Sequence, residues 1–235
     1  MKSPRVATAK CGTGRALRLG SAGLLAMACL SLHAEELRYT INLPTGVSLG
    51  EGSITATQTP GGRMFQLSVD ASFPGFAIRD QFSSHSTEAL CSLRFEKDST
   101  HGARTTKETS TFDAARGVVV RETLGGGKSE MPAPACARDV LAFLFFLRQE
   151  LAAGRVPGPA TLFFGATYEA RLTHMGIEEA TVAGVRVQAD RIAASLKGPA
   201  SITNLELLFS RDQAHTPLVI RIPFALGTFA MELAR

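Results

Sequence analysis

The chain has 235 residues, of which 45% are hydrophobic and 20% charged, and its formal net charge is +4 at pH 7. Residues 1–18 contain five basic and no acidic side chains, so residues 19–235 hold 20 basic against 21 acidic side chains, a net charge of −1. A nucleic-acid partner is therefore not expected, because a nucleic-acid footprint needs clustered Lys and Arg on the folded protein.

The first predicted segment, residues 1–34, has the order of a cleavable secretory signal. Its basic stretch precedes an apolar run over Leu19–Leu32 and the small residue Ala34. Because this run is shorter than the roughly 20 apolar residues that cross a bilayer, cleavage is favoured over a retained anchor. Lipidation at Cys29 ranks below simple cleavage, since the usual Leu of a lipoprotein box is missing. We expect a mature protein that starts near Glu35, has no transmembrane segment and is periplasmic or otherwise exported.

Residues 35–235 are expected to form a single β-rich domain. Apolar and polar side chains alternate with the period of half-buried strands. The strands predicted before residue 125 are Leu37–Leu43, Ser53–Thr59, Met64–Asp70, Ile78–Ser84, Ser92–Glu96, Arg104–Phe112 and Val118–Leu124. Pro60–Gly62 predicts a hairpin turn between the second and third strands, and Gly125–Gly127 is expected to end this meander.

One helix is predicted from Val140 onward, with Asp139 placing an acid in its first turn and Gly154 ending it. The run Val140–Leu147 is apolar on nearly every side instead of along one stripe. A helix of this kind must be buried on more than one face, so the strands are expected to enclose it.

Strands are predicted to resume after the helix, with tight turns at Met175-Gly176 and Ala183-Gly184. They are Ala160–Phe164, Tyr168–Met175, Ile177–Val182, Val185–Ser195, Asn204–Ser210, Leu218–Pro223 and Thr228–Leu233. The predicted fold is mainly β: a curved antiparallel sheet or open β-barrel of about a dozen strands with one buried apolar helix.

Two cysteines follow the leader, Cys91 and Cys136. In an oxidising compartment two such thiols are expected to pair, although two buried free cysteines are the alternative. A disulfide between them would close a loop of 46 residues, counted inclusively. A redox-active site is not expected, because no Cys-x-x-Cys motif is present.

The order of several short motifs resembles a known family. These are Asp139, Leu141–Arg148, Tyr168, Gly176, Arg211-Asp212, Pro217-Leu218 and Gly227. The order is similar to that of the exported domain of unknown function 3108 family of Gram-negative bacteria, from about Tyr39 to Leu233. His215 departs from the longer basic residue expected there, and the two cysteines resemble an addition in a subgroup. The resemblance implies a periplasmic or envelope location and a β-rich fold, and it implies no activity.

No catalytic, cofactor-binding or metal-binding motif is predicted, and no cofactor is expected. Gly125–Ser129 superficially resembles a phosphate-binding loop, but that motif requires Gly where Glu122 stands, so a flexible turn is favoured. Asp80, Ser84 and His85 lie close in sequence, yet Asp80 and His85 would point to opposite faces of a strand. This favours a protein that is not an enzyme.

The apolar helix is interpreted first as core and second as the wall of a pocket for an apolar or lipidic ligand. In the second interpretation the cavity lies between curved sheet and helix, and Phe143, Phe145, Phe146 and Arg148 line it. An apolar volume of several hundred Å³, the size of small-molecule sites, would favour this function.

Two further functions stay open at this point. A packed interior would favour a purely structural or partner-binding envelope module. A site assembled from distant strands around His85 or His174 would indicate an envelope hydrolase. Ligand identity, partners and oligomeric state do not follow from the residue pattern.

Overall fold

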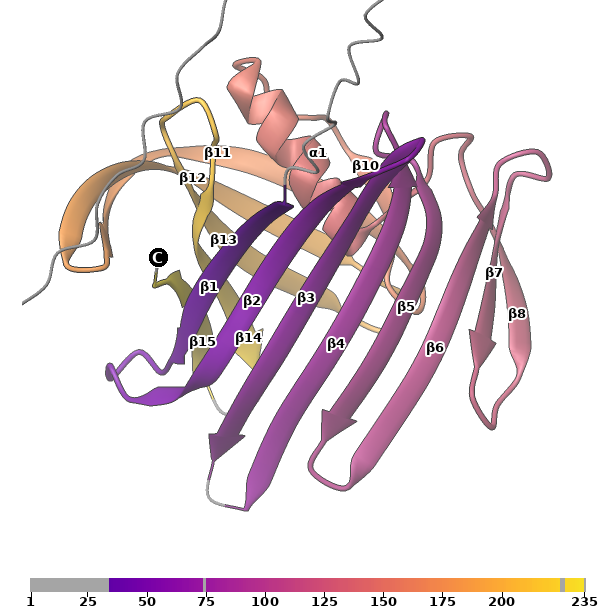
Figure 1. Ribbon diagram of the computed structural model, residues 1–235, viewed down its shortest axis with the longest axis horizontal. Helices are drawn as coiled ribbons and strands as arrows, with labels where there is room; N and C mark the ends of the chain where they lie inside the picture. Colours follow the sequence, from indigo (N-terminus) through magenta and orange to yellow (C-terminus); the bar gives the residue numbers. More distant parts are fainter. Residues whose placement is uncertain (1–33, 74, 225–226, 235) are drawn as a thin grey trace, which may run out of the picture. The chain divides into compact units, whose positions relative to one another are not determined.

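One open sheet holds every strand of the residues described by the computed structural model, which are 34–73, 75–224 and 227–234 (Figure 1). The strands are β1 (Ala34–Asn42), β2 (Ser48–Thr59), β3 (Gly62–Phe73), β4 (Phe76–Thr87), β5 (Ser92–His101), β6 (Arg104–Asp113), β7 (Val118–Thr123), β8 (Lys128–Pro132), β9 (Arg138–Asp139), β10 (Ala160–Phe163), β11 (Thr167–Val182), β12 (Val185–Lys197), β13 (Ile202–Ser210), β14 (Pro217–Phe224) and β15 (Gly227–Leu233). The predicted signal up to residue 33, with Cys29, lies outside the described residues.

The sheet is built from two antiparallel meanders. Its strand order is β8-β7-β6-β5-β4-β3-β2-β1-β15-β14-β13-β12-β11-β10-β9, so β1 pairs with β15 in the middle. Among these neighbours the two-residue strand β9 is parallel to β10, and the other pairs are antiparallel. The predicted hairpin between β2 and β3 is confirmed, since Thr59 pairs with Gly62 and Gly61 takes the left-handed conformation its turn requires.

The two ends of the sheet approach each other through side chains. Phe112 of β6 packs edge-on against Phe163 of β10, with ring centroids 5.6 Å apart. Arg121 of β7 donates from Nη1 to the carbonyl oxygen of Gly165 at 2.6 Å. The sheet therefore curls into a barrel-like body whose last gap is closed by side chains instead of a strand ladder, and the prediction of a curved sheet or open barrel is confirmed.

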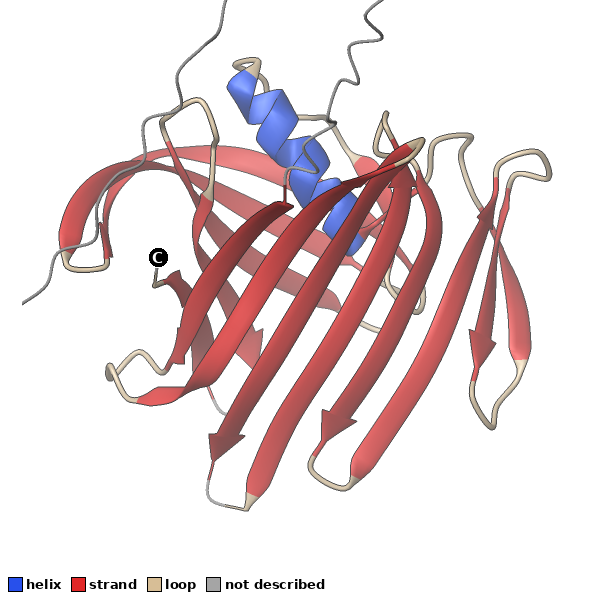
Figure 2. Cartoon of the chain, in the orientation of Figure 1, coloured by secondary structure: helices blue, strands red, loops and turns tan. Residues whose placement is uncertain are grey.

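Helix α1 (Val140–Ala152) lies between the strands of the two meanders, at one end of the curved sheet (Figure 2). It packs against β3, β4, β9 and β10, and its apolar side chains join a core cluster that includes residues of both meanders. The predicted buried helix is confirmed. Asp139 is its N-cap residue, one position before the first turn in which the sequence placed it.

Two local features differ from the expected pattern, and a third agrees with it. The first meander continues past Gly125–Gly127 into β8, because those glycines form a hairpin turn. Met175-Gly176 is a register shift inside the single strand β11, with Gly176 at a φ of 100°. A glycine within a strand is a frequent site of such a bulge. The turn predicted at Ala183-Gly184 is confirmed, since both residues have positive φ.

Candidate ligand-binding cavity

The helix fills only one end of the space that the curved sheet encloses. Along β3 the inward side chains alternate, beginning with Phe65, Leu67 and Val69. Phe65 is completely buried, and its ring stacks on that of Phe145 in the helix with centroids 4.1 Å apart. Leu67 and Val69 point the same way but are only partly buried. The packing around this inward row is therefore looser at Leu67 and Val69 than at Phe65.

Beyond that row lies a cavity of about 540 Å³. This volume is in the range of about 300–1,000 Å³ that holds small-molecule ligands. One wall of it is apolar and comes from β1, β2, β3, β4, β14 and β15. Its principal side chains are Leu67, Val69, Ala71, Ile78, Ile222 and Met231. Lining residues from both meanders show that the cavity belongs to the interior of the curled sheet.

A second, polar wall comes from β4, β5 and β6. Lys97, Ser99 and His101 alternate along β5 and share the inward face with the buried Phe95. Their partners across the ladder to β6 are Glu108, Thr106 and Arg104, in that order. The cavity is thus amphipathic, with hydrocarbon on one side and charged and hydroxyl groups on the other.

The carboxylates of the polar wall already have cationic or ring-nitrogen partners. Asp80 accepts from Nε2 of His101, at 3.0 Å and 3.2 Å to its two oxygens. Glu108 forms an ion pair with Arg121 at 3.1 Å, and its other oxygen, Oε2, is buried without a hydrogen bond. Both carboxylates therefore have a partner within the protein, and Oε2 of Glu108 keeps an unused acceptor position.

Ser99 lies opposite Asp80 in the ladder and is 6% exposed. Its Oγ has no hydrogen-bond partner within the described residues. Since His101 does not bond Ser99, the three side chains Asp80, His101 and Ser99 do not form the relay of a serine hydrolase. A buried hydroxyl facing a cavity without a partner is instead a donor available to a ligand.

The structure places the four helix residues expected to line a pocket elsewhere than in this cavity. Phe143 packs with Leu162 and Ala170. Phe146 carries the Arg138 guanidinium 3.9 Å from its ring centroid. The faces of the helix that carry Phe143 and Phe146 are therefore occupied by neighbouring strands or side chains.

Phe145 and Arg148 do border a second hollow, of about 290 Å³, whose lining shares no residue with that of the cavity. There Arg148 donates both Nη atoms to the carboxylate of Glu35, each at 2.8 Å, and also bonds the carbonyl oxygen of Ala214. This bidentate pair ties the helix to β1, and it satisfies the guanidinium within the protein.

Asp139 is the most deeply buried acid of the described residues, with an exposed fraction of 0%. Its Oδ2 accepts from the hydroxyls of Ser84 and Ser92, each at 2.6 Å. Its Oδ1 accepts from the backbone amides of Leu141 and Ala142, at 2.9 Å and 3.0 Å. Burial raises the pKa of this carboxyl, and the four hydrogen bonds oppose the rise.

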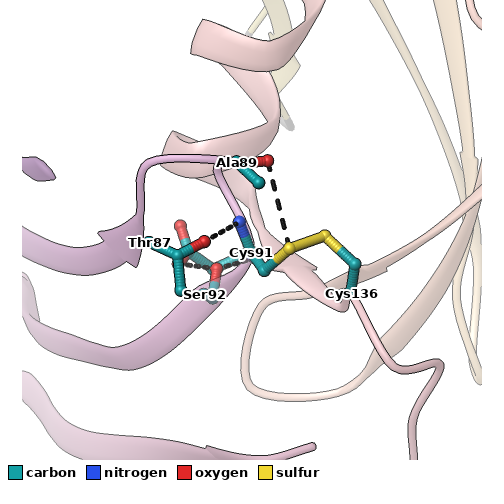
Figure 3. The surroundings of a disulfide bond; sticks show 6 residues. Thr87, Ala89, Cys91, Ser92 and Cys136 are labelled. Atoms are coloured by element: carbon teal, nitrogen blue, oxygen red, sulfur yellow. Dashed lines mark hydrogen bonds between the residues drawn. A yellow bond between two sulfur atoms is a disulfide. The ribbon is translucent and has the colours of Figure 1, made fainter. Parts of the chain in front are cut away.

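Cys91 and Cys136 form a disulfide, the pairing expected of an oxidising compartment (Figure 3). Cys91 lies in the turn between β4 and β5, where its amide donates to Oγ1 of Thr87 at 3.2 Å. Ser92 donates its amide to the carbonyl oxygen of Ala137 at 2.9 Å. The disulfide therefore fixes the segment before β9 beside β5, next to the Asp139 cap.

The other groupings considered in the sequence do not assemble. Asp80 pairs with His101 and Ser84 with Asp139, so neither joins His85. His174 bonds Asp190 at 3.1 Å on the partly exposed side of β11 and β12. Lys128 pairs with Glu122 across the β7–β8 turn instead of serving a phosphate loop. In the described ranges no group of three His, Cys, Asp or Glu side chains is placed to hold a metal.

Within the part of the chain that the structure describes, no helix is both long and apolar enough to span a bilayer. The family described as "Protein of unknown function (DUF3108)" matches residues 37–234. Comparison with curated proteins gives no match. Among solved structures the chain is similar to a β-barrel-like protein of the domain of unknown function DUF1849 from Brucella abortus, with 8% identity and a TM-score of 0.58. That alignment covers 87% of this chain and 97% of the other, and at this identity it shows likeness of fold alone.

Proposed function

The chain belongs to the family of proteins of unknown function DUF3108, and we propose that it binds an apolar or lipidic ligand in the amphipathic cavity. The observation that supports this most strongly is the cavity of about 540 Å³ inside the curled sheet. Leu67, Val69 and Phe82 lie on the inward face of the sheet, yet they keep part of their surface uncovered. Covering apolar surface of this kind with a hydrocarbon is favourable, by roughly 25 cal/mol per Å² removed from water. A purely structural module would be supported by a packed interior.

We also propose that the protein acts in the periplasm or another exported location. The basic and apolar order of residues 1–34 and the Cys91–Cys136 disulfide support this location. Expression in a Gram-negative host followed by N-terminal sequencing of the periplasmic protein tests it. The expected sequence begins near Glu35, and an uncleaved chain confined to the cytoplasm would overturn the proposal.

A cavity-filling substitution tests the binding proposal. Ala71 is 3% exposed and lies on the apolar wall, so the ring of Ala71→Phe would occupy the space offered to a ligand. We expect the wild type to bind the neutral fluorescent probe N-phenyl-1-naphthylamine at one saturable site. The variant is expected to bind it at least about tenfold more weakly. The added ring would exclude the probe from contact with roughly one apolar side chain of the wall, and that contact is worth about this much affinity.

Ser72→Phe is the matched control, because it adds the same ring at the neighbouring, exposed position. It should leave probe affinity unchanged. Val69→Phe, from the next inward position, repeats the test if Ala71→Phe does not fold, as judged by its urea unfolding transition. A wild type that fails to bind the probe, or folded filling variants that bind it as well as the wild type, would refute the proposed function.

A further inference from the structure

The charges of the polar wall do not balance. With His101 neutral, the wall and its attached Arg121 carry three cationic side chains and two carboxylates. Asp80 and Glu108 are both engaged, by His101 and Arg121. Two cations facing the cavity, Lys97 and Arg104, form no ion pair within 4 Å in the described ranges. The cavity thus offers positive charge whose counter-ion is not a protein group.

Lys97 is the inner of these two cations. Its ammonium lies 4.7 Å from the ring centroid of Phe164, a contact that holds the side chain over the cavity without neutralising it. Glu108 is its ladder neighbour, but the carboxylate of Glu108 is turned to Arg121 and Gly165. Arg104 is more exposed and sits where β5 turns into β6, at the rim.

The unpartnered hydroxyl of Ser99 is the second, independent observation. Ser99 and Lys97 are two residues apart on β5, so both side chains leave the same face, separated by roughly 7 Å of strand. A hydroxyl donor and an ammonium at this spacing can bind one anionic head group together. Burial makes the pair worth more to a ligand than the same groups in water.

We propose that the ligand is an amphiphile with an anionic head group, a carboxylate or a phosphate. Lys97 Nζ and Ser99 Oγ bind the head, and the chain lies against the apolar wall that includes Val69, Ile222 and Met231. This inference rests on the proposed function, since it names the ligand class of the same cavity.

Competition against bound N-phenyl-1-naphthylamine tests the head-group specificity. Dodecanoate and dodecanol share one chain length and differ in charge, and acetate and inorganic phosphate are anions without a chain. Below the concentrations at which micelles form, dodecanoate is expected to displace the probe at about tenfold lower concentration than dodecanol, as one charge-assisted hydrogen-bonded contact predicts. Acetate and phosphate are expected to displace none of it, because they cannot use the apolar wall.

Lys97→Met keeps most of the side chain's length and removes its charge. It should abolish the preference for dodecanoate, measured as the ratio of the dodecanol and dodecanoate concentrations that displace the probe from this same variant. Ser99→Ala should reduce dodecanoate affinity severalfold. Lys107→Met is the matched control, because Lys107 is an exposed lysine of β6 that pairs with Asp98 on the outer face. This control should retain the full preference.

The outcomes separate the two proposals. Equal displacement by dodecanol and dodecanoate, or an undiminished preference in Lys97→Met, would overturn the anionic-head inference while leaving apolar binding intact. Displacement by acetate or phosphate alone would also overturn it, since it would indicate a site for small anions. Failure of the wild type to bind the probe would overturn the proposed function itself.

Discussion

Replacing Asp139 by alanine is expected to lower the free energy of unfolding by about 3–5 kcal/mol. The substitution removes the N-cap of α1, which by itself is worth about 0.5–2 kcal/mol. It also leaves the buried hydroxyls of Ser84 and Ser92 without their acceptor, and each unsatisfied buried group costs about 1–3 kcal/mol. Urea denaturation of the two proteins, followed by circular dichroism, measures the difference.

Asp113→Ala is the matched control for this substitution. Asp113 also accepts a backbone amide, that of Arg116 at 3.0 Å, but it lies at the solvent-accessible end of β6. Its loss should cost less than about 1 kcal/mol. An Asp139→Ala variant as stable as Asp113→Ala would contradict the assignment of Asp139 as the buried link between helix, β4 and β5.

Asp139→Asn adds a test by pH. Because burial raises the pKa of Asp139, its carboxyl binds a proton more tightly in the folded than in the unfolded state. The stability that the carboxyl contributes is therefore greatest at pH values below its pKa in the unfolded state. It declines as the pH rises from that pKa to the higher pKa of the folded state. The difference in unfolding free energy between the wild type and Asp139→Asn should decline over the same window and be constant above it.

Removing the disulfide is expected to have an effect of similar size. The chain-entropy model assigns about 4 kcal/mol to a bridge between residues 45 apart in sequence. The double variant Cys91→Ser/Cys136→Ser should therefore unfold at lower urea concentration than the oxidised wild type. A reductant should bring the wild type close to the variant and leave the variant itself unchanged. Equal midpoints for oxidised wild type and variant would show that the bridge does not stabilise the folded state.

The fold could be predicted because the strand segments and the helix segment have different hydrophobic patterns and occupy different parts of the chain. Alternation predicts strands such as Met64–Asp70, and the run Val140–Leu147, with Asp139 before it and Gly154 after it, favours a buried helix. The strand β8 was missed because Lys128–Pro132 is mostly exposed and has no apolar alternation. The β9 strand was missed because it is two residues long.

The cavity was harder to foresee because β5 is polar on both faces. After Phe95 the inward residues are Lys97, Ser99 and His101, while Glu96 and Asp98 between them face outward. Phe95 is the main residue that indicates which face of β5 points inward. The sequence therefore does not show whether Lys97, Ser99 and His101 or Glu96 and Asp98 line the interior. A pocket walled by four helix residues was expected instead, but strand and side-chain neighbours cover Phe143 and Phe146, and Phe145 and Arg148 border only the smaller hollow of about 290 Å³.

The lengths of the helix and strands give a physical reason why the helix leaves a cavity inside the curled sheet. A helix of 13 residues is roughly 20 Å long, whereas strands of 12 residues extend roughly 40 Å. One such helix can therefore plug only part of the interior that β2, β3 and β4 enclose. The remaining inward rows, which begin at Leu67 and Phe82, line the cavity of about 540 Å³.

Isoleucine methyl resonances, recorded while the purified protein is titrated with dodecanol, test this central claim most directly. Ile41, Ile78 and Ile222 border the cavity, whereas Ile192 is packed in the core and Ile202 is exposed. The hollow-interior account predicts saturable shifts at the first three and none at Ile192 or Ile202. Shifts confined to Ile202, or no saturable shift at any of the five, would contradict it.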